Sequence, residues 1–198
     1  MQAFKPSDEV DFSRRYTLEE FWGLPEREDG AHYDLIEGHI YMVPPANPPH
    51  DRLDARFTRA LLKFLIDNNI DGEVLHPHAP IYRADASTYF EPDMMYVSSE
   101  LREQMSDKQT SADIVFEYLS KRTSNYDRTK KADAYLALGI PELWLVDPVT
   151  VTIEVRYAST HEGAPVWETY KYSTGEYAKS RVLAGWEVSV DEIFKDLV

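Results

Sequence analysis

Two apolar segments separated by a helical segment constrain the fold of this chain more than any other feature. Residues 111–120 (SADIVFEYLS) and 143–147 (LWLVD) have the composition of covered strands. Between them, residues 124–142 (SNYDRTKKADAYLALGIPE) form the clearest predicted helix, with Ser124 as a good N-cap and Gly139 marking its end. This order of strands and helices predicts a sheet with helices packed on it, and not a helical bundle or a sandwich.

Shorter patterns extend this arrangement along the chain. One helix is predicted after Thr17, in a capping-box pattern, and another from about Asp51 to Asn69, where apolar residues fall at helical spacing. The segment YDLIEGHIYMV predicts a hairpin around its Glu-Gly turn, and PPANPP predicts a loop without helix. Further strands are predicted at EVLHPHAPIYRA, at EPDMMYVSSE and in a C-terminal meander of VTIEVRYA, VWETYKY and WEVSV. We therefore predict an α/β (α+β) fold in which helices flank a mixed central β-sheet.

Length and composition limit the organisation and the surroundings of the chain. Its 198 residues fit a single domain over residues 1–198, with the polar residues 1–14 expected to be flexible. The formal net charge of −14 argues against sequence-independent adhesion to nucleic acid or anionic membrane, but it allows a local basic site. There is no cysteine, so disulfides and thiolate chemistry are excluded. Because the sequence has neither a signal-peptide pattern nor an apolar stretch of membrane-spanning length, we predict a cytoplasmic protein without a membrane partner.

Glu117 is the residue that does not fit its predicted strand. A carboxylate among apolar neighbours must be paired or bound to a metal to stay ionised. Asp93 stands at the start of another apolar strand, directly after Pro92, so pairing of the two strands would bring both acids to one end of the sheet. Because adjacent carboxylates repel each other, a hard divalent ion such as Mg²⁺ is the expected partner.

A lysine on the following helix completes this candidate site. Lys131 lies one turn beyond Asp127, on the helix that begins just after the strand of Glu117 ends. A lysine near a metal-bound water can position that water and neutralise negative charge on a phosphoryl group. Taken alone, Lys131 has the ordinary interpretation of a solvated helix residue paired with Asp127.

The run ADIVFEYLSKRTSNYDRTKKADAYLALGIPELWLVD resembles the core of the Uma2-like endonucleases, a domain of unknown function in the PD-(D/E)xK, restriction-endonuclease-like superfamily. YDLIEGHIYMVPP, EPDMMYV and LAGWEVSVDEIF resemble other blocks of that family in the same order, so the resemblance spans nearly the whole chain from about Thr17. It implies a restriction-endonuclease-like fold and an endonuclease that hydrolyses DNA phosphodiester bonds with Mg²⁺ or Mn²⁺. Nucleases of this superfamily often act in pairs, which implies a homodimer.

The resemblance also implies roles for individual residues. Asp93 matches the acid of the PD motif and Glu117 matches the acid of the second strand, so both are expected to bind the metal. The lysine usually found two residues after the second acid is replaced by Leu119. The aligned lysine is Lys131 on the helix, and its neighbour Lys130 is the residue that would substitute for it.

A further acid comes from the early hairpin. Asp34 in YDLIEGHIYMVPP matches an acidic position of the family, where glutamate is more usual. The resemblance implies that Asp34 is an additional catalytic residue, as a further ligand of the metal or of its water.

Two concentrations of positive charge are candidate DNA contacts, since phosphate binding needs such clusters. One is a basic stripe at helical spacing on the predicted helix 51–69, and the other is KRTSNYDRTKK beside the proposed site. The candidates are Arg52, Arg56, Arg59 and Lys63 in the stripe, and Lys121, Arg122 and Lys130 in the second cluster. The ordinary interpretation of the stripe is a solvated helix face that neighbouring aspartates balance.

Two other function classes remain open. A non-catalytic interaction protein would keep the nuclease fold without its activity, which the acidic charge and the missing strand lysine allow. A histidine-metal enzyme on a β-rich barrel would use His50, His76 and His78, because residues two apart on a strand share a face. Histidines are common on half-exposed strands, so we favour an ordinary structural role for them.

Overall fold

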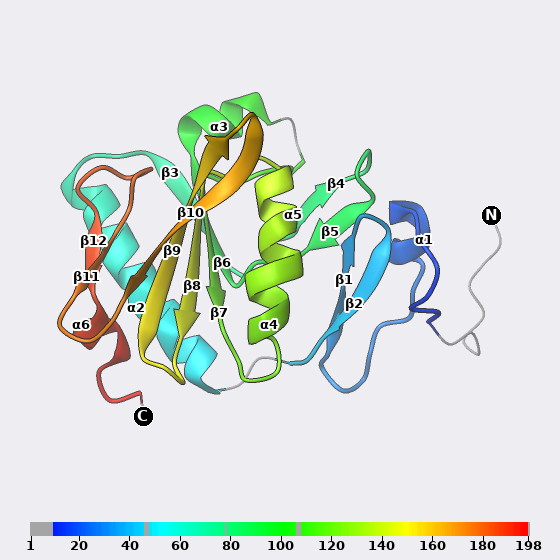
Figure 1. Ribbon diagram of the computed structural model, residues 1–198, viewed down its shortest axis with the longest axis horizontal. Coiled ribbons are helices and arrows are strands. Elements are labelled where there is room, and N and C mark those ends of the chain that lie inside the picture. Colours follow the sequence, from blue (N-terminus) through cyan, green and yellow to red (C-terminus); the bar gives the residue numbers. More distant parts are fainter. Residues whose placement is uncertain (1–9, 46–47, 78, 106–107, 198) are drawn as a thin grey trace.

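A six-stranded mixed sheet forms the centre of the computed structural model, which describes residues 10–45, 48–77, 79–105 and 108–197 (Figure 1). Its strands are β3 (Gly72–Leu75), β6 (Met94–Ser98), β7 (Ile114–Tyr118), β8 (Glu142–Asp147), β9 (Thr152–His161) and β10 (Ala164–Tyr172). They lie in the order β10-β9-β8-β7-β6-β3. Only the β7–β8 pair is parallel within this sheet, and the other neighbours are antiparallel. The predicted mixed central sheet is confirmed.

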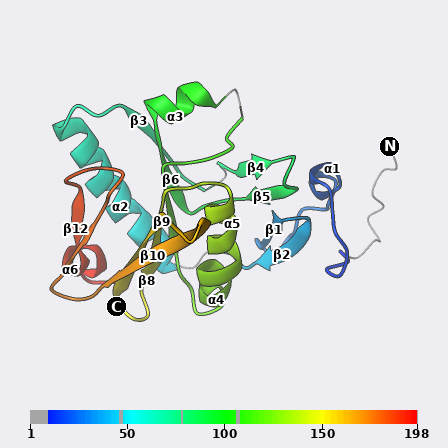
Figure 2. The same cartoon turned by 45° about the horizontal axis from the view of Figure 1, so that its top comes forward.

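Helices cover both faces of this sheet because side chains alternate along the central strand. Phe116 of β7 packs in the cluster that contains Leu53 and Phe57 of α2 (Pro48–Asp67). Val115, on the opposite face, packs with Tyr135 of α5 (Ala132–Ala137). The helices α2 and α5 therefore lie on opposite sides of the sheet (Figures 1 and 2). Burial on both faces explains why this strand is apolar at nearly every position.

A second, antiparallel sheet carries the N-terminal part of the fold. Its strands are β1 (His32–Ile36), β2 (His39–Val43), β4 (Ile81–Arg83) and β5 (Thr88–Phe90), in the order β2-β1-β5-β4. The predicted hairpin is confirmed, and Glu37 and Gly38 make its turn with positive φ angles. Helix α1 (Leu18–Trp22) begins with the predicted capping box of Thr17 and Glu20. This sheet lies on the far side of α5 from the central sheet (Figures 1 and 2).

The helix between β7 and β8 is built from three pieces. They are α4 (Ser124–Tyr126), a π-helical turn η1 (Asp127–Lys131) and α5. Ser124 was predicted to be the N-cap, but it is the first residue of α4 and Thr123 occupies the N-cap position. The Ser120 hydroxyl accepts a hydrogen bond from the Thr123 N–H, and the Ser120 carbonyl accepts one from the Ser124 N–H. The helix start is set one turn earlier, by the tight turn that follows β7, and the π-helical turn had no counterpart in the prediction.

Three other predicted boundaries differ from the structure. Helix α2 begins at Pro48, inside PPANPP, because proline is well suited to the first turn of a helix. The segment EVLHPHAPIYRA forms two strands, β3 and β4, which belong to different sheets. The C-terminal meander is limited to β9 and β10, since β12 (Glu187–Ser189) pairs instead with β11 (Tyr177–Lys179) in a separate two-stranded sheet.

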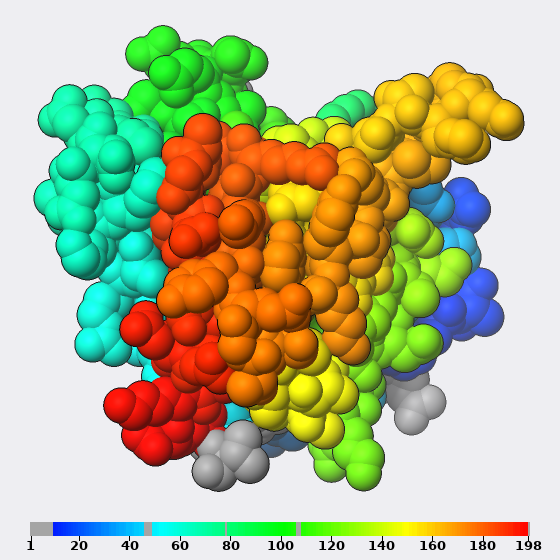
Figure 3. All heavy atoms as spheres, turned by 60° about the vertical axis from the view of Figure 1, so that its left-hand side comes forward, coloured from blue at the N-terminus to red at the C-terminus, as the bar shows by residue number. Residues whose placement is uncertain are grey.

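The remaining elements close the periphery of the fold. They are α3 (Ser99–Gln104), after β6, and α6 (Val190–Phe194), which packs against α2. The tip of the β9–β10 hairpin stands out from the body, in yellow-orange at the upper right of Figure 3. Of the segment predicted to be flexible, residues 1–9 lie outside the described residues, and Asp11 accepts hydrogen bonds from Ser13. Within the described parts of the chain, no helix has the length and apolar composition needed to cross a membrane.

Candidate active site

The strand pairing brings Asp93 and Glu117 to one end of the central sheet. Met94 of β6 lies opposite Phe116 of β7 in the antiparallel register. Asp93 directly precedes Met94 and Glu117 directly follows Phe116, so the two acids come next to each other at the end of this pairing. The Tyr118 N–H donates to Asp93 Oδ2 over 2.6 Å, which ties the two strands together there. Glu117 extends on the face opposite to α2, toward η1, because its neighbour Phe116 packs on the α2 side.

The ammonium group of Lys131 lies beside Glu117. Lys131 Nζ is 2.8 Å from Glu117 Oε1 and 3.9 Å from Asp34 Oδ2, and it donates to the Glu91 carbonyl over 3.2 Å. The Tyr135 hydroxyl donates to the same Glu117 oxygen. Lys131 is only 3% exposed, so this pair is shielded from bulk water.

The π-helical turn accounts for which side chains enter the site. In a regular α-helix, positions four residues apart rotate by about 40° around the axis at each step. The π-helical turn has more residues per revolution, which compensates for this rotation. Asp127, Lys131 and Tyr135 are therefore all buried on the same side of the helix. Lys130 is exposed on the next face. The structure therefore places Lys131, and not Lys130, beside Glu117, while its catalytic role stays a prediction.

Asp34 reaches the same cluster from the second sheet. It is fully buried on β1, and its Oδ2 accepts a hydrogen bond of 2.9 Å from the Tyr126 hydroxyl. Its Oδ1 is buried without a hydrogen-bond partner among the described residues and lies 3.9 Å from His32 Nε2. Asp34 is thus held by the helix that also carries Lys131, in the space between the two sheets.

Burial and mutual repulsion shift the pKa values of this cluster. Burial raises the pKa of Glu117 well above its usual value, against the opposing effect of Lys131. Burial also raises the pKa of Asp93, which Lys131 and His50 oppose. The pKa of Asp127 is raised to about 6, again chiefly by burial. Burial by itself disfavours the charged form of Lys131, but the surrounding carboxylates outweigh it and raise the pKa of this ammonium group.

A small cavity of about 60 Å³, named the acidic cavity, opens between these groups. Its walls are formed by His32, Val43, Pro44, Pro45, His50, Glu91, Asp93, Glu117, Tyr118, Ser120, Thr123, Asp127 and Lys131. The volume accommodates a few water molecules or a hydrated ion with part of its shell. The residues come from strands β1, β2 and β7, from the segment before β6, from the β7–α4 loop and η1, and from the β2–α2 connection and the start of α2.

The two acids of the strands fit a hydrated divalent ion. Asp93 binds the Tyr118 N–H through Oδ2, and Glu117 binds Lys131 and Tyr135 through Oε1. Each therefore keeps one oxygen that accepts no hydrogen bond from the described residues. Nowhere in those residues are three carboxylate or imidazole groups gathered closely enough to hold an ion by themselves. Two carboxylates with remaining water ligands is a donor set that Mg²⁺ accepts.

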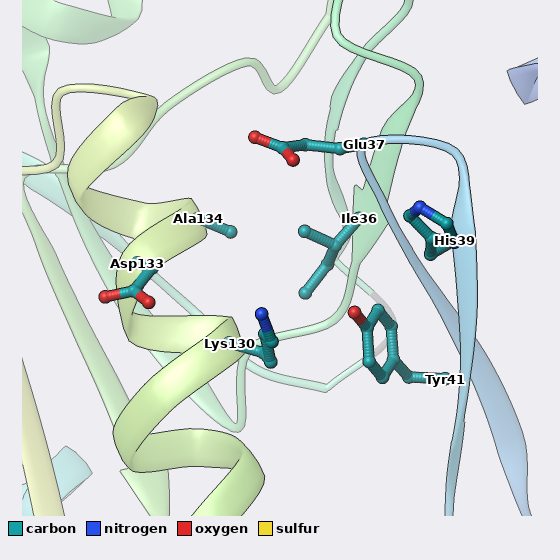
Figure 4. Close-up of a pocket in the computed structure, with 7 residues that line it drawn as sticks. All are labelled: Ile36, Glu37, His39, Tyr41, Lys130, Asp133 and Ala134. Atoms are coloured by element: carbon teal, nitrogen blue, oxygen red, sulfur yellow. The ribbon is translucent and has the colours of Figure 1, made fainter. Parts of the chain in front are cut away.

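A second cavity, of about 420 Å³, lies between the helix and the β1–β2 hairpin. Figure 4 shows the Lys130 ammonium group directed into it, with Tyr41 and Ile36 on the hairpin side and Asp133 on the helix side. Lys130 therefore lines this second cavity, whereas its neighbour Lys131 lines the smaller one.

The predicted basic residues fall into two groups. Arg56 is occupied within the fold, since its Nη1 donates to the Ile193 carbonyl over 2.6 Å, and Lys63 pairs with Asp67. The others are exposed, and they are Arg52, Arg59, Lys121, Arg122 and Lys130. The stripe on α2 is therefore not uniformly free to meet a nucleic acid.

Among the described residues, no histidines gather into the metal site of a histidine-metal enzyme. His76 follows the end of β3, and its Nδ1 lies 3.1 Å from Asp54 Oδ1. His78 lies outside the described residues. His50 lies in the first turn of α2, on the wall of the acidic cavity of about 60 Å³.

Sequence reasoning missed the tyrosines that hold the acids. Tyr126 binds Asp34 and Tyr135 binds Glu117. Tyr135 lies four residues after Lys131, so helical spacing was an available signal that both face the same way. Tyr126 had no such signal, because its contact depends on how the second sheet packs against the helix.

The comparisons with known proteins agree with this architecture. The sequence model of the Uma2 family, described as putative restriction endonuclease, matches residues 18–191. A crystal structure of a putative nuclease belonging to DUF820 from Anabaena variabilis ATCC 29413 is similar, with a TM-score of 0.73 and 21% sequence identity. The match covers 92% of this chain and 99% of that one, and at this identity it shows a shared fold. A comparison with curated proteins gave no match.

Proposed function

Because this chain belongs to the Uma2 family, described as putative restriction endonuclease, we propose that it is a Mg²⁺-dependent endonuclease that hydrolyses DNA phosphodiester bonds. The observation that supports this most is the meeting of Asp93 and Glu117 at one end of the sheet, each with a free oxygen, beside the buried Lys131. The runner-up proposal is a non-catalytic interaction protein that keeps the fold.

Asp93 and Glu117 would hold the ion, with Asp34 as a more distant acid behind Lys131. When bound, a divalent ion supplies charge stabilisation for the phosphate and a more acidic water. Mn²⁺ suits the same oxygen donors.

Lys131 orients Glu117 and limits the repulsion between the acids. Its ammonium group has three donors, and the Glu117 carboxylate and the Glu91 carbonyl take two of them. The remaining donor can hold the attacking water or a phosphate oxygen. In the ground state Lys131 thus compensates carboxylate charge, and in the reaction it is placed to offset the charge that grows on the phosphate.

DNA would approach over the loop between β7 and α4. Lys121 and Arg122 are exposed in that loop, directly after Ser120 on the cavity wall. Arg52 is exposed on α2, two residues after His50, which also lines the cavity. These three cations surround an acidic site in a chain of net charge −14, so we assign them the main phosphate contacts.

The interaction-protein alternative draws support from the internal pairing of the cluster. Glu117 is already bound by Lys131 and Tyr135, so it has partners even without an ion. A chain that had lost activity would be able to keep such a pair for structural reasons.

Cleavage of duplex, single-stranded and branched DNA, with Mg²⁺, with Mn²⁺ and with a chelator, tests the proposal. Wild-type protein should cleave only with metal, and Glu117→Gln should lose about 100-fold or more in rate. Millimolar metal should also raise the melting temperature of the wild type more than that of Glu117→Gln, because only the folded site binds it.

Glu103→Gln is the matched control, since Glu103 is exposed on α3 away from the cavity. It should behave as wild type. An equal melting response to metal in all three proteins, without cleavage, would instead favour the interaction protein.

A homodimer is the expected assembly, because nucleases of the superfamily that the chain resembles often pair to cut both strands of a duplex. Sedimentation velocity of the protein with and without a short duplex would measure it. A protein that stays monomeric in both samples would contradict the expected homodimer.

A further inference from the structure

His50 is the least satisfied polar side chain on the wall of the acidic cavity. Both of its ring nitrogens are buried, and neither has a hydrogen-bond partner among the described residues. Buried polar atoms without partners are rare, and they indicate a water molecule or ligand that completes the site. The ring is held edge-on against Tyr118, with centroids 6.1 Å apart.

The other nitrogen groups on the cavity wall have partners among the described residues. Lys131 donates to Glu117 and to the Glu91 carbonyl, which leaves one of its three donors for a ligand. His32 has one buried nitrogen without a hydrogen bond, but it lies 3.9 Å from Asp34 Oδ1, so Asp34 is the group available to pair with it. His50 acts on the Asp93 carboxyl only through its charge and has no hydrogen-bond partner among the described residues, so both of its nitrogens remain available to an incoming ligand.

The position of His50 also suits a ligand that enters from outside. His50 lies in the first turn of α2, whereas Lys131 enters from η1 and Asp93 and Glu117 from the strands. Helix α2 is held at this point by the Tyr118 hydroxyl, which donates to Asp54 over 3.3 Å. The imidazole thus has a fixed backbone, a packed ring and free nitrogens, which are the properties of a preorganised contact.

An anionic phosphodiester cannot be bound by the carboxylates alone. Five acids line or border the site, namely Asp34, Glu91, Asp93, Glu117 and Asp127, and one buried lysine lies among them. A substrate phosphate therefore needs a further donor that is not already bound to a carboxylate. An imidazole N–H satisfies this need without adding a permanent charge to the empty site.

We propose that His50 is a catalytic residue that donates a hydrogen bond to a non-bridging oxygen of the scissile phosphodiester, from the α2 side of the cavity. This inference rests on the proposed nuclease function and adds a second donor to the substrate, from α2, beside the one donor that Lys131 keeps.

Steady-state cleavage by His50→Ala and His50→Gln tests it, with DNA affinity measured in Ca²⁺ and thermal melts in parallel. Loss of a hydrogen bond to a charged group predicts a decrease in kcat/KM of about 10- to 100-fold for His50→Ala. His50→Gln keeps an N–H donor and should recover part of this loss, and added imidazole should partly restore His50→Ala. The control is His161→Ala, on the exposed tip of β9, which should match the wild type.

Each remaining outcome overturns the inference in a recognisable way. If the wild type cleaves and His50→Ala cleaves equally well, the nuclease function stands and the His50 contact is wrong. A lower melting temperature with rescue by neither glutamine nor imidazole would assign His50 a structural role. If added imidazole restores His50→Ala but glutamine does not substitute for His50, then His50 accepts a proton in the reaction and does not act as a hydrogen-bond donor. A wild type that cleaves none of the DNA substrates removes the proposed function, and this inference with it.

Discussion

At the scale of single residues, the site is a balance between several buried acids and one lysine. Lys131 is the nearest cation to both Glu117 and Asp34, and it is itself almost completely buried. Removing one acid leaves others to pair with the lysine, whereas removing the lysine leaves several carboxylates without a compensating charge. The two kinds of substitution should therefore differ sharply in their effect on stability.

Lys131→Met should lower the free energy of unfolding by about 3–5 kcal/mol at pH 7.5, since it leaves buried carboxylates unpaired. The loss should be smaller at pH 5, because the carboxylates, whose pKa values are already raised by burial, take up protons there. Urea unfolding at the two pH values measures both quantities. Lys130→Met, on the exposed neighbouring position, is the control and should change stability little. An equal loss at both pH values would contradict the charge-balance explanation.

Asp127 should make the protein less stable as pH rises. Its pKa is raised from 3.8 to about 6 in the folded state, so the folded protein binds this proton more tightly than the unfolded chain does. That stabilising contribution is present below about pH 4 and is lost as pH rises through 6. Asp127→Asn should therefore gain up to about 3 kcal/mol relative to wild type between pH 4 and pH 7, at about 1.4 kcal/mol per pKa unit. Chemical unfolding across this range measures the difference.

The exposed Asp133, on the same helix, provides the comparison. Asp133→Asn should follow the wild-type pH dependence. If Asp127→Asn also follows it, the carboxylate of Asp127 does not carry the predicted desolvation penalty.

At the scale of secondary-structure elements, the π-helical turn sets the alignment of the site. It lies between α4 and α5 and keeps Asp127, Lys131 and Tyr135 on the buried side of one helix. Such wide turns contain an extra residue relative to an α-helix and are often found at functional sites. The helix therefore presents an anchoring tyrosine and a lysine to the same acid.

Deletion of Thr129 should convert this turn to a regular α-helix and abolish the alignment. Thr129 is exposed, and its hydroxyl donates only to the Asn125 carbonyl, so little packing is lost. Either Asp127 or Lys131 would then rotate away from Glu117, and misplacement on this scale costs about 100-fold or more in cleavage rate. Circular dichroism should show a retained fold.

Thr129→Ala separates the loss of the side chain from the loss of the residue. It should remain active, because the backbone and the turn stay in place. A deletion variant with wild-type activity would exclude a role for the turn in positioning Lys131.

At the scale of the whole molecule, the helix η1–α5 is enclosed between two sheets. The central sheet supplies Asp93 and Glu117, and the second sheet supplies Asp34 (Figure 1). The surface around this acidic centre carries a few exposed cations in a chain of net charge −14. Binding of DNA should consequently depend on a small number of positive side chains and weaken steeply with salt.

The double substitution of Lys121 and Arg122 by alanine should weaken DNA binding and lower the salt dependence. Removing two phosphate contacts should reduce the slope of log affinity against log salt by about 1.8. Fluorescence anisotropy in Ca²⁺ at several salt concentrations measures this slope. The control replaces Lys63, which pairs with Asp67, and the exposed Lys171 by alanine, with the same change of net charge. Equal slopes for the two double variants would show that net charge alone sets the salt dependence and that Lys121 and Arg122 make no specific phosphate contacts.

The local sequence determined the central elements of this protein. The apolar runs around Phe116 and Trp144 specified buried strands, and the capping box at Thr17 specified the start of α1. The misfit of Glu117 in its strand, with Asp93 at the start of another, was sufficient to predict where the acids meet. These features depend on burial and on hydrogen bonds between residues near in sequence, so pattern and composition record them.

The tertiary structure decided how the site is completed, beyond what local patterns of residues show. Asp34, which only the family resemblance had indicated, and His50 reach it from β1 and α2, far from Glu117 in the sequence. The choice of Lys131 over Lys130 follows from the π-helical turn, and the boundary at Pro48 follows from where α2 packs. Such features depend on helix rotation and on contacts between distant segments. The free energy that fixes them comes from packing and from the pairing of buried charges, which no local pattern of residues encodes.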